Sequence, residues 1–181
     1  GSADMLEELG YKISNEIKSI KENLEKNNFC FMFAQYHHSA MKHVINVRKQ
    51  LETRTIFNLL GPLTNPANTK YQLMGVYNKN LVNIHCQVLK DLGSIHCMVV
   101  HGDDGLDEIS LSGITHVAEL KNNKISNYQI DPKEYGYNYI NNDEIKGGSA
   151  KYNAQKFIEM IDGKNLKFQH IVELNAGAAL Y

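Results

Sequence analysis

Residues 71–100 read YQLMGVYNKNLVNIHCQVLKDLGSIHCMVV, and this stretch decides the fold class. Residues 71–77 and 95–100 are apolar runs of strand length, whereas residues 81–92 between them have helical spacing and stop before Gly93. A crossover helix returns the chain to the end of the sheet where the first strand began, so the two strands should pair in parallel. We therefore expect an α/β fold with a largely parallel central sheet.

The segments on either side extend this sheet. Upstream, residues 29–33 are an unbroken apolar run, FCFMF, which favours a strand buried on both faces and therefore helices on both faces of the sheet. Downstream, residues 115–120 and 124–130 predict two short strands that form an antiparallel edge, joined by a turn at Asn122 and Asn123. Further helices are expected from Ser2 to a stop at Gly10 and over residues 14–25, 39–51, 54–60, 149–161 and 166–181.

The amino-acid composition limits the kinds of molecule that the chain is expected to bind. The chain has 181 residues, which suits one domain, and a net charge of −1 with 19 basic and 20 acidic residues. Such a balance gives no long-range field to attract nucleic acid or an acidic membrane, so an anionic ligand needs a local pocket. Three cysteines without a CxxC pair argue against a disulfide framework. With no apolar run near the roughly 18 residues of a membrane span, we expect a cytoplasmic protein.

The two ends of the chain indicate a fragment. The sequence opens GSAD without a methionine and closes NAGAALY inside an apolar helical pattern, so we expect truncation at both ends. Gly1 and Ser2 are either native residues or the remnant of a removed tag.

An acidic segment, HGDDGLDE at residues 101–108, directly follows a predicted parallel strand. Loops at the carboxyl ends of such strands are where open α/β sheets bind ligands. Asp107 and Glu108 are adjacent, and Mg²⁺ typically takes one or two carboxylates, several waters and the phosphate oxygens of a substrate. The segment is therefore either a magnesium-binding site or a solvated acidic turn.

Two further features could contact a substrate. Arg48 lies on a predicted helix, and its guanidinium could bind a planar carboxylate through two parallel hydrogen bonds; His38 falls near it at helical spacing. The alternative is the basic outer face of an amphipathic helix. The loop GPLTNP at residues 61–66 is stiffened by two prolines and could form a rigid pocket wall, although loops of this composition also occur without any site.

The segments FMFAQYHHSAMKHVINVRKQLETRTIFNLLGPLTNPA at 31–67 and VVHGDDGLDEISLSG at 99–113 closely resemble the anthranilate phosphoribosyltransferases. The opening GSAD and closing NAGAALY fit the same family, so the resemblance covers essentially the whole chain. It implies a subunit with a small helical domain and a larger α/β domain, usually paired as a homodimer. This chain would be most of the α/β domain, without the small N-terminal helical domain.

The resemblance also implies roles for individual residues. The family transfers the phosphoribosyl group of phosphoribosyl pyrophosphate to the amino group of anthranilate and releases pyrophosphate, so no side-chain nucleophile is expected. By position, Asp107 and Glu108 would bind Mg²⁺ with the pyrophosphate, and Ser2 would lie in the phosphoribosyl pyrophosphate pocket. Arg48 would bind the carboxylate of anthranilate. The anthranilate tunnel would be lined by His38, Gly61 and Pro62.

Three family segments, GTGGD, N-x-S-T and KHGN, would lie before Gly1 and are absent from the chain. Because they cradle the sugar phosphate, we expect the 181-residue chain to be inactive alone. Two other readings stay open: a pyrimidine nucleoside phosphorylase-like enzyme on the same fold, and a non-catalytic folding or dimerisation module.

Overall fold

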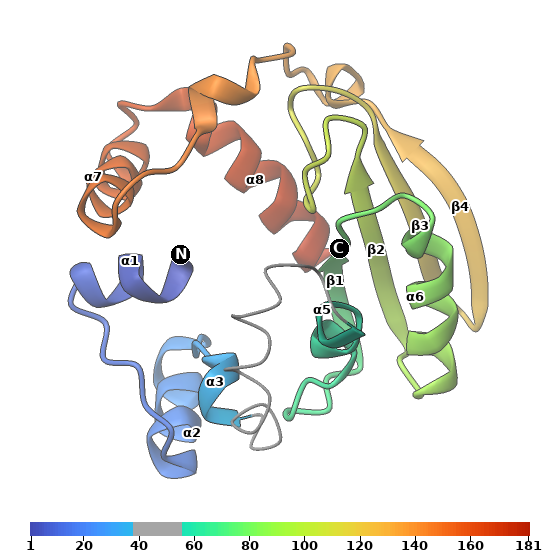
Figure 1. The fold of residues 1–181 in the computed structure, drawn as a ribbon, viewed down its shortest axis with the longest axis horizontal. Coiled ribbons are helices and arrows are strands. Elements are labelled where there is room, and N and C mark those ends of the chain that lie inside the picture. Colours follow the sequence, from blue (N-terminus) through green and yellow to red (C-terminus); the bar gives the residue numbers. More distant parts are fainter. Residues whose placement is uncertain (38–55) are drawn as a thin grey trace. The chain divides into compact units, whose positions relative to one another are not determined.

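The computed structural model describes residues 1–37 and 56–181, and it divides the chain into two compact units (Figure 1). The first unit is Gly1–Pro66 with Gly148–Ala154, and the second is Ala67–Gly147 with Gln155–Tyr181. The helix expected over residues 39–51 lies outside the described residues.

The described part of the first unit is helical apart from its connections. It contains α1 (Ser2–Glu8), α2 (Ile17–Asn27), α3 (Ala34–His37), α5 (Ile56–Leu60) and the 3-10 turn η1 (Gly61–Leu63). The first helix stops where expected, because Gly10 has φ 87° and its nitrogen donates to the carbonyl of Glu7.

The strand expected over residues 29–33 is wrong, because these residues form no regular structure. Their aromatic side chains pack within the unit instead: Phe33 and Tyr36 meet edge to face with ring centroids 5.2 Å apart, and Phe29 packs similarly on Tyr11. The nitrogen of Phe31 donates to the hydroxyl of Tyr11 at 3.1 Å. An aromatic cluster gives the same apolar run as a buried strand, so the run alone could not distinguish them.

The second unit is built on a four-stranded sheet of order β1-β2-β3-β4. Its strands are β1 (Tyr71–Gly75), β2 (His96–Gly102), β3 (Thr115–Lys121) and β4 (Lys124–Ile130). β1 and β2 pair in parallel, which confirms the strand, helix, strand prediction, and β2-β3 and β3-β4 pair antiparallel. The α/β class and the antiparallel edge are confirmed. Parallel pairing is less extensive than expected in the described sheet, because residues 29–33 do not add a strand to it.

Helices cover both faces of this sheet, as expected. The crossover helix α6 (Leu81–Asp91) packs on β2, β3 and β4, and α8 (Leu166–Leu180) contacts β1. Side chains alternate between the faces of a strand. Met98 and Val100 of β2 accordingly point toward Leu174 and Ala178 of α8, while Cys97 and Val99 belong to the other face.

The remaining elements are the 3-10 turns η2 (Pro132–Tyr135) and η3 (Asn142–Ile145) and the helix α7 (Ala150–Ile161). The predicted turn between β3 and β4 is confirmed. Asn122 and Asn123 have φ 52° and 61°, and a type I′ hairpin turn requires positive φ at both positions. Among the described residues, no helix has both the length and the apolar character needed to cross a membrane.

Candidate functional site

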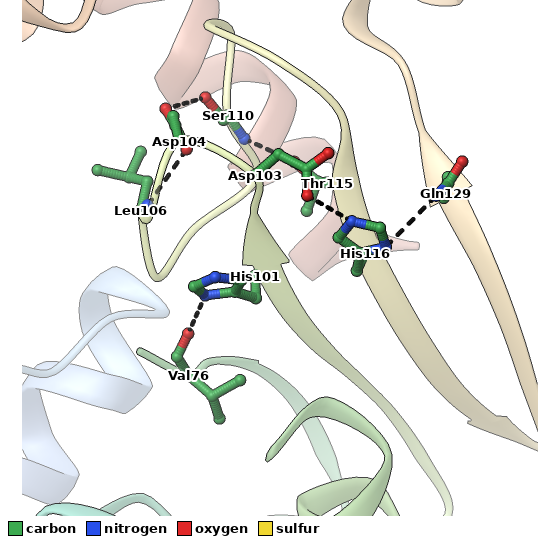
Figure 2. A network of polar contacts seen from close by, with 9 residues as sticks. All are labelled: Val76, His101, Asp103, Asp104, Leu106, Ser110, Thr115, His116 and Gln129. Carbon is green, nitrogen blue, oxygen red and sulfur yellow. Dashed lines mark hydrogen bonds and ion pairs between the residues drawn. The ribbon is translucent and has the colours of Figure 1, made fainter. Parts of the chain in front are cut away.

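The candidate site is the loop Gly102–Ser110, which leaves the carboxyl end of β2 beside the end of β1 (Figure 2). The two strand ends are tied together. The nitrogen of Val76 donates to the carbonyl of Val100 at 3.0 Å, and Nδ1 of the buried His101 donates to the carbonyl of Val76 at 2.7 Å. The loop therefore begins from a fixed edge of the sheet, where α/β folds bind ligands.

Asp104 organises the first turn of the loop. Its Oδ2 accepts a hydrogen bond from Ser110 Oγ at 2.6 Å, and its Oδ1 accepts one from the nitrogen of Leu106 at 3.2 Å. The nitrogen of Gly102 donates to the carbonyl of Leu106 at 2.8 Å, which closes the turn. Gly105 has φ 91°, a conformation that side chains disfavour, so glycine suits the tip of this turn.

Asp103 ties the loop to the antiparallel edge. Its Oδ1 lies 2.6 Å from Nε2 of His116 on β3, and Nδ1 of that imidazole is 3.4 Å from Nε2 of Gln129 on β4 (Figure 2). A carboxylate accepts and a side-chain NH₂ donates, so the arrangement suits a histidine that carries its proton on Nε2. The first acidic pair of the loop is thus engaged in holding the loop itself.

The second acidic pair differs. Asp107 and Glu108 are both exposed, and neither carboxylate has a hydrogen bond or ion pair to another residue within the part of the chain that the structure describes. Although Glu108 is exposed as a residue, its carboxyl group is partly desolvated by the protein around it. This desolvation, with the negative charge of Asp107, raises the pKa of Glu108.

The backbone of this pair is packed closely on the sheet. A Cβ atom added at Gly75, the last residue of β1, would collide with the carbonyl group of Asp107. Only glycine leaves room for this approach. The main chain is therefore held against the end of β1, while the two carboxylates remain available to a ligand.

This donor set fits a magnesium ion better than a metal that needs an all-protein cage. No group of three or more metal-binding side chains is found among residues 1–37 and 56–181. Mg²⁺ binds hard oxygen donors, keeps several waters and often uses only one or two carboxylates together with substrate phosphates. The adjacent carboxylates of Asp107 and Glu108, which have no partner among the described residues, meet that requirement.

The other residues predicted from the sequence fall elsewhere. Ser2 is the exposed first residue of α1, and Gly61 and Pro62 open η1. All three belong to the first unit, whereas Asp107 and Glu108 belong to the second. His38 and Arg48 lie outside the described residues.

Sequence reasoning missed Asn175, a residue of α8. Its side-chain amide makes two hydrogen bonds to the main chain of Ile109, next to Glu108: Oδ1 accepts from the nitrogen at 2.9 Å and Nδ2 donates to the carbonyl at 2.8 Å. The available signal was a polar amide at helical spacing from Ile171 and Ala178, on the face that packs against the sheet.

Comparisons with known proteins show the family to which the chain belongs. The family model described as "Glycosyl transferase family, a/b domain" matches residues 1–181. The anthranilate phosphoribosyltransferase of Chromobacterium violaceum is 48% identical over 181 residues, which are 100% of this chain and 53% of that protein. That of Clostridium beijerinckii is 49% identical over 182 residues, again 100% of this chain and 53% of the relative. The chain thus spans about half the length of the curated relatives it matches.

Solved structures give the same result. The anthranilate phosphoribosyltransferase of Thermus thermophilus superposes with a TM-score of 0.89 at 37% identity, covering 100% of this chain and 54% of that one. The Saccharomyces cerevisiae enzyme, solved in complex with PRPP and Mg, gives 0.85 at 27% identity and covers 97% of this chain and 51% of that one. The chain belongs to the glycosyl transferase family, whose a/b domain model it matches.

Proposed function

We propose that this chain is the α/β part of an anthranilate phosphoribosyltransferase of tryptophan synthesis. The enzyme would transfer the phosphoribosyl group of phosphoribosyl pyrophosphate to the amino group of anthranilate and release pyrophosphate. One observation carries the proposal: Asp107 and Glu108 stand unpartnered, among the described residues, at the carboxyl end of a parallel strand pair. The similarity to relatives of this name supports it along the whole chain.

The role of the acidic pair follows from electrostatics. Two adjacent carboxylates repel each other and would also repel the phosphates of the substrate. Mg²⁺ held by Asp107 and Glu108 would neutralise the negative charge that develops on the leaving pyrophosphate. The loop's main task is then to hold the two carboxylates in a fixed position, and Gly75 and the hydrogen bonds of Asp104 support this by fixing the main chain.

The remaining roles rest on the family resemblance. Arg48 would bind the carboxylate of anthranilate, His38, Gly61 and Pro62 would line the pocket for its ring, and Ser2 would contact phosphoribosyl pyrophosphate. Oriented substrates can react without a protein nucleophile, because positioning alone removes much of a barrier. A homodimeric parent enzyme in the cytoplasm remains part of the prediction.

We also propose that the 181-residue chain does not turn over substrate by itself. The test compares this chain with a chimera in which it is joined, in the order of the relative, to the part of the Chromobacterium violaceum enzyme that it does not match. Loss of anthranilate fluorescence with phosphoribosyl pyrophosphate and Mg²⁺ is the readout. We expect turnover by the chimera and none by the chain alone.

Substitutions in the chimera assign the activity to the acidic pair. Asp107→Asn with Glu108→Gln should abolish Mg²⁺-dependent turnover, while Asp103→Asn in the same loop should retain most of it. Turnover by the isolated chain would overturn the inactivity proposal. A folded chimera that ignores anthranilate but splits a pyrimidine nucleoside with phosphate would overturn the proposed substrate.

A further inference from the structure

Asn175 connects the last helix to the acidic loop. It lies on α8, 66 positions along the chain from Ile109, and its amide makes the paired 2.9 Å and 2.8 Å hydrogen bonds to the nitrogen and carbonyl of that residue. Its Nδ2 also donates to the carbonyl of Ile171, one helical turn earlier, at 2.9 Å. The side-chain amide is therefore bonded both to its own helix and to the loop.

The bonded nitrogen belongs to the peptide unit that joins Glu108 to Ile109. Fixing that peptide plane fixes the direction in which the main chain of Glu108 leaves the core. The side chain of Ile109 is fully buried and packs with Leu174 and Ala178 of the same helix. Asn175 thus supplies a directional contact where the neighbouring side chains supply only apolar packing.

The loop is held from two other sides. Its first turn is closed by Asp104, and its main chain at Asp107 is pressed against Gly75. Beyond the acidic pair, Ser110 is also restrained, because its hydroxyl donates to Asp104 and its nitrogen donates to Oγ1 of Thr115 at 2.9 Å. Asn175 makes the side-chain hydrogen bonds to Ile109, the residue immediately after the acidic pair, so its loss would loosen the main chain next to Glu108.

Asparagine is a poor residue for the interior of a helix, because its side chain competes for backbone hydrogen bonds. An asparagine on the packed face of a helix is stabilised when its amide has a hydrogen-bond partner elsewhere in the fold. Here that partner is the main chain of Ile109. We propose that Asn175 is a positioning residue that holds the Asp107–Glu108 carboxylates for a divalent cation; the cation part of this inference rests on the function proposed above.

The test uses the 181-residue chain and NMR spectroscopy. Mn²⁺ serves as the probe, because it shares the oxygen-ligand preference of Mg²⁺ and broadens nearby amide signals. Asn175→Ala removes both hydrogen bonds to Ile109. Asn175→Leu, of similar size and better helix propensity, does the same and guards against loss of the helix. Gln169→Ala is the matched control, since that amide also lies on α8 but bonds Glu173 of its own helix at 2.7 Å.

Two results are expected. Both Asn175 variants should bind Mn²⁺ at residues 107–108 about tenfold more weakly, the effect typical of losing a group that orients a metal ligand. Hydrogen exchange at the Ile109 amide should rise by about tenfold, because a hydrogen bond that protects it is gone. Higher Mn²⁺ concentrations should restore the original broadening pattern, which a misfolded loop would not do. Gln169→Ala should change neither quantity.

The outcomes separate this inference from the proposed function. No broadening at residues 107–108 in the unaltered chain would overturn the cation site itself, and with it the cation part of the inference. Broadening with equal Mn²⁺ affinity in the unaltered chain and in folded Asn175→Ala or Asn175→Leu would overturn the positioning role and leave the cation site standing.

Discussion

The loop Gly102–Ser110 contains two pairs of adjacent acidic residues, and the two pairs differ in the hydrogen bonds of their carboxylates. Asp103 and Asp104 are hydrogen bonded, to His116 in one case and to Ser110 and Leu106 in the other. Asp107 and Glu108 are exposed residues whose carboxylates have no such partners among the described residues. Four carboxylates within six positions therefore perform two kinds of task.

The difference follows from where the donors are. The first pair lies at the closed turn, where the loop's own nitrogen and hydroxyl groups converge on Asp104. In the second pair, the carbonyl of Asp107 lies close against Gly75 and the next residue, Ile109, is bonded to Asn175, while no described residue bonds the two carboxylates. Acidic composition alone does not identify a cation site; carboxylates with a fixed backbone and unoccupied oxygens do.

The largest expected effect on stability comes from breaking the first pair. Asp104→Ala removes the acceptor of the fully buried Ser110 hydroxyl and of the Leu106 nitrogen. A buried donor without an acceptor costs about 1–3 kcal/mol of unfolding free energy, which urea unfolding would measure. The same truncation at exposed Asp107 should stay within about 0.5 kcal/mol. Equal losses at the two positions would contradict the division of the loop.

Much of this arrangement could be predicted from the sequence where the signal is local. The apolar runs and helical spacing of residues 71–100 correctly gave the parallel pair, and two asparagines between alternating strands gave the β3-β4 turn. The position of the acidic loop also followed, because a loop after a parallel strand must leave at the carboxyl edge.

The rest depended on contacts between distant residues. The run at residues 29–33 was misassigned because aromatic residues that cluster with Tyr11 have the same composition as a buried strand. Asn175 was missed as a partner of Ile109 because the two are 66 residues apart, and no local pattern pairs them. Which acidic pair is hydrogen bonded was equally invisible, since Asp103 finds His116 only after β3 has folded back.

A smaller effect should follow from Asp103→Asn. The side chain of Asp103 is 53% exposed and that of His116 is 12% exposed, so solvent screens the pair substantially. A hydrogen bond typically contributes about 0.5–1.5 kcal/mol, and the amide retains an acceptor oxygen for the imidazole, so only part of this should be lost. Urea unfolding measures the difference. A loss as large as that of Asp104→Ala would mean that Asp103 closes the loop as firmly as its neighbour does.

The smallest change in unfolding free energy is expected from Glu108→Gln. The test is whether this variant is more or less stable than the unaltered chain. Because desolvation and Asp107 raise the pKa of Glu108 above its ordinary value of 4.5, the folded state binds its proton more tightly than the unfolded state does. The unfolding free energy should therefore fall as the pH rises from 4.5 through the raised pKa of the folded state, and then remain level.

Glu108→Gln removes that penalty, so the variant should be more stable than the unaltered chain at neutral pH and equal to it below pH 4.5. Urea unfolding across this range is the measurement. Glu134→Gln, in η2 beside Lys133 instead of beside another acid, is the control and should not reproduce the gain. Mg²⁺ should shrink the difference at neutral pH, because a bound cation stabilises the folded state of the unaltered chain alone. A variant less stable at neutral pH would show that the Glu108 carboxylate contributes to the fold, as Asp104 does.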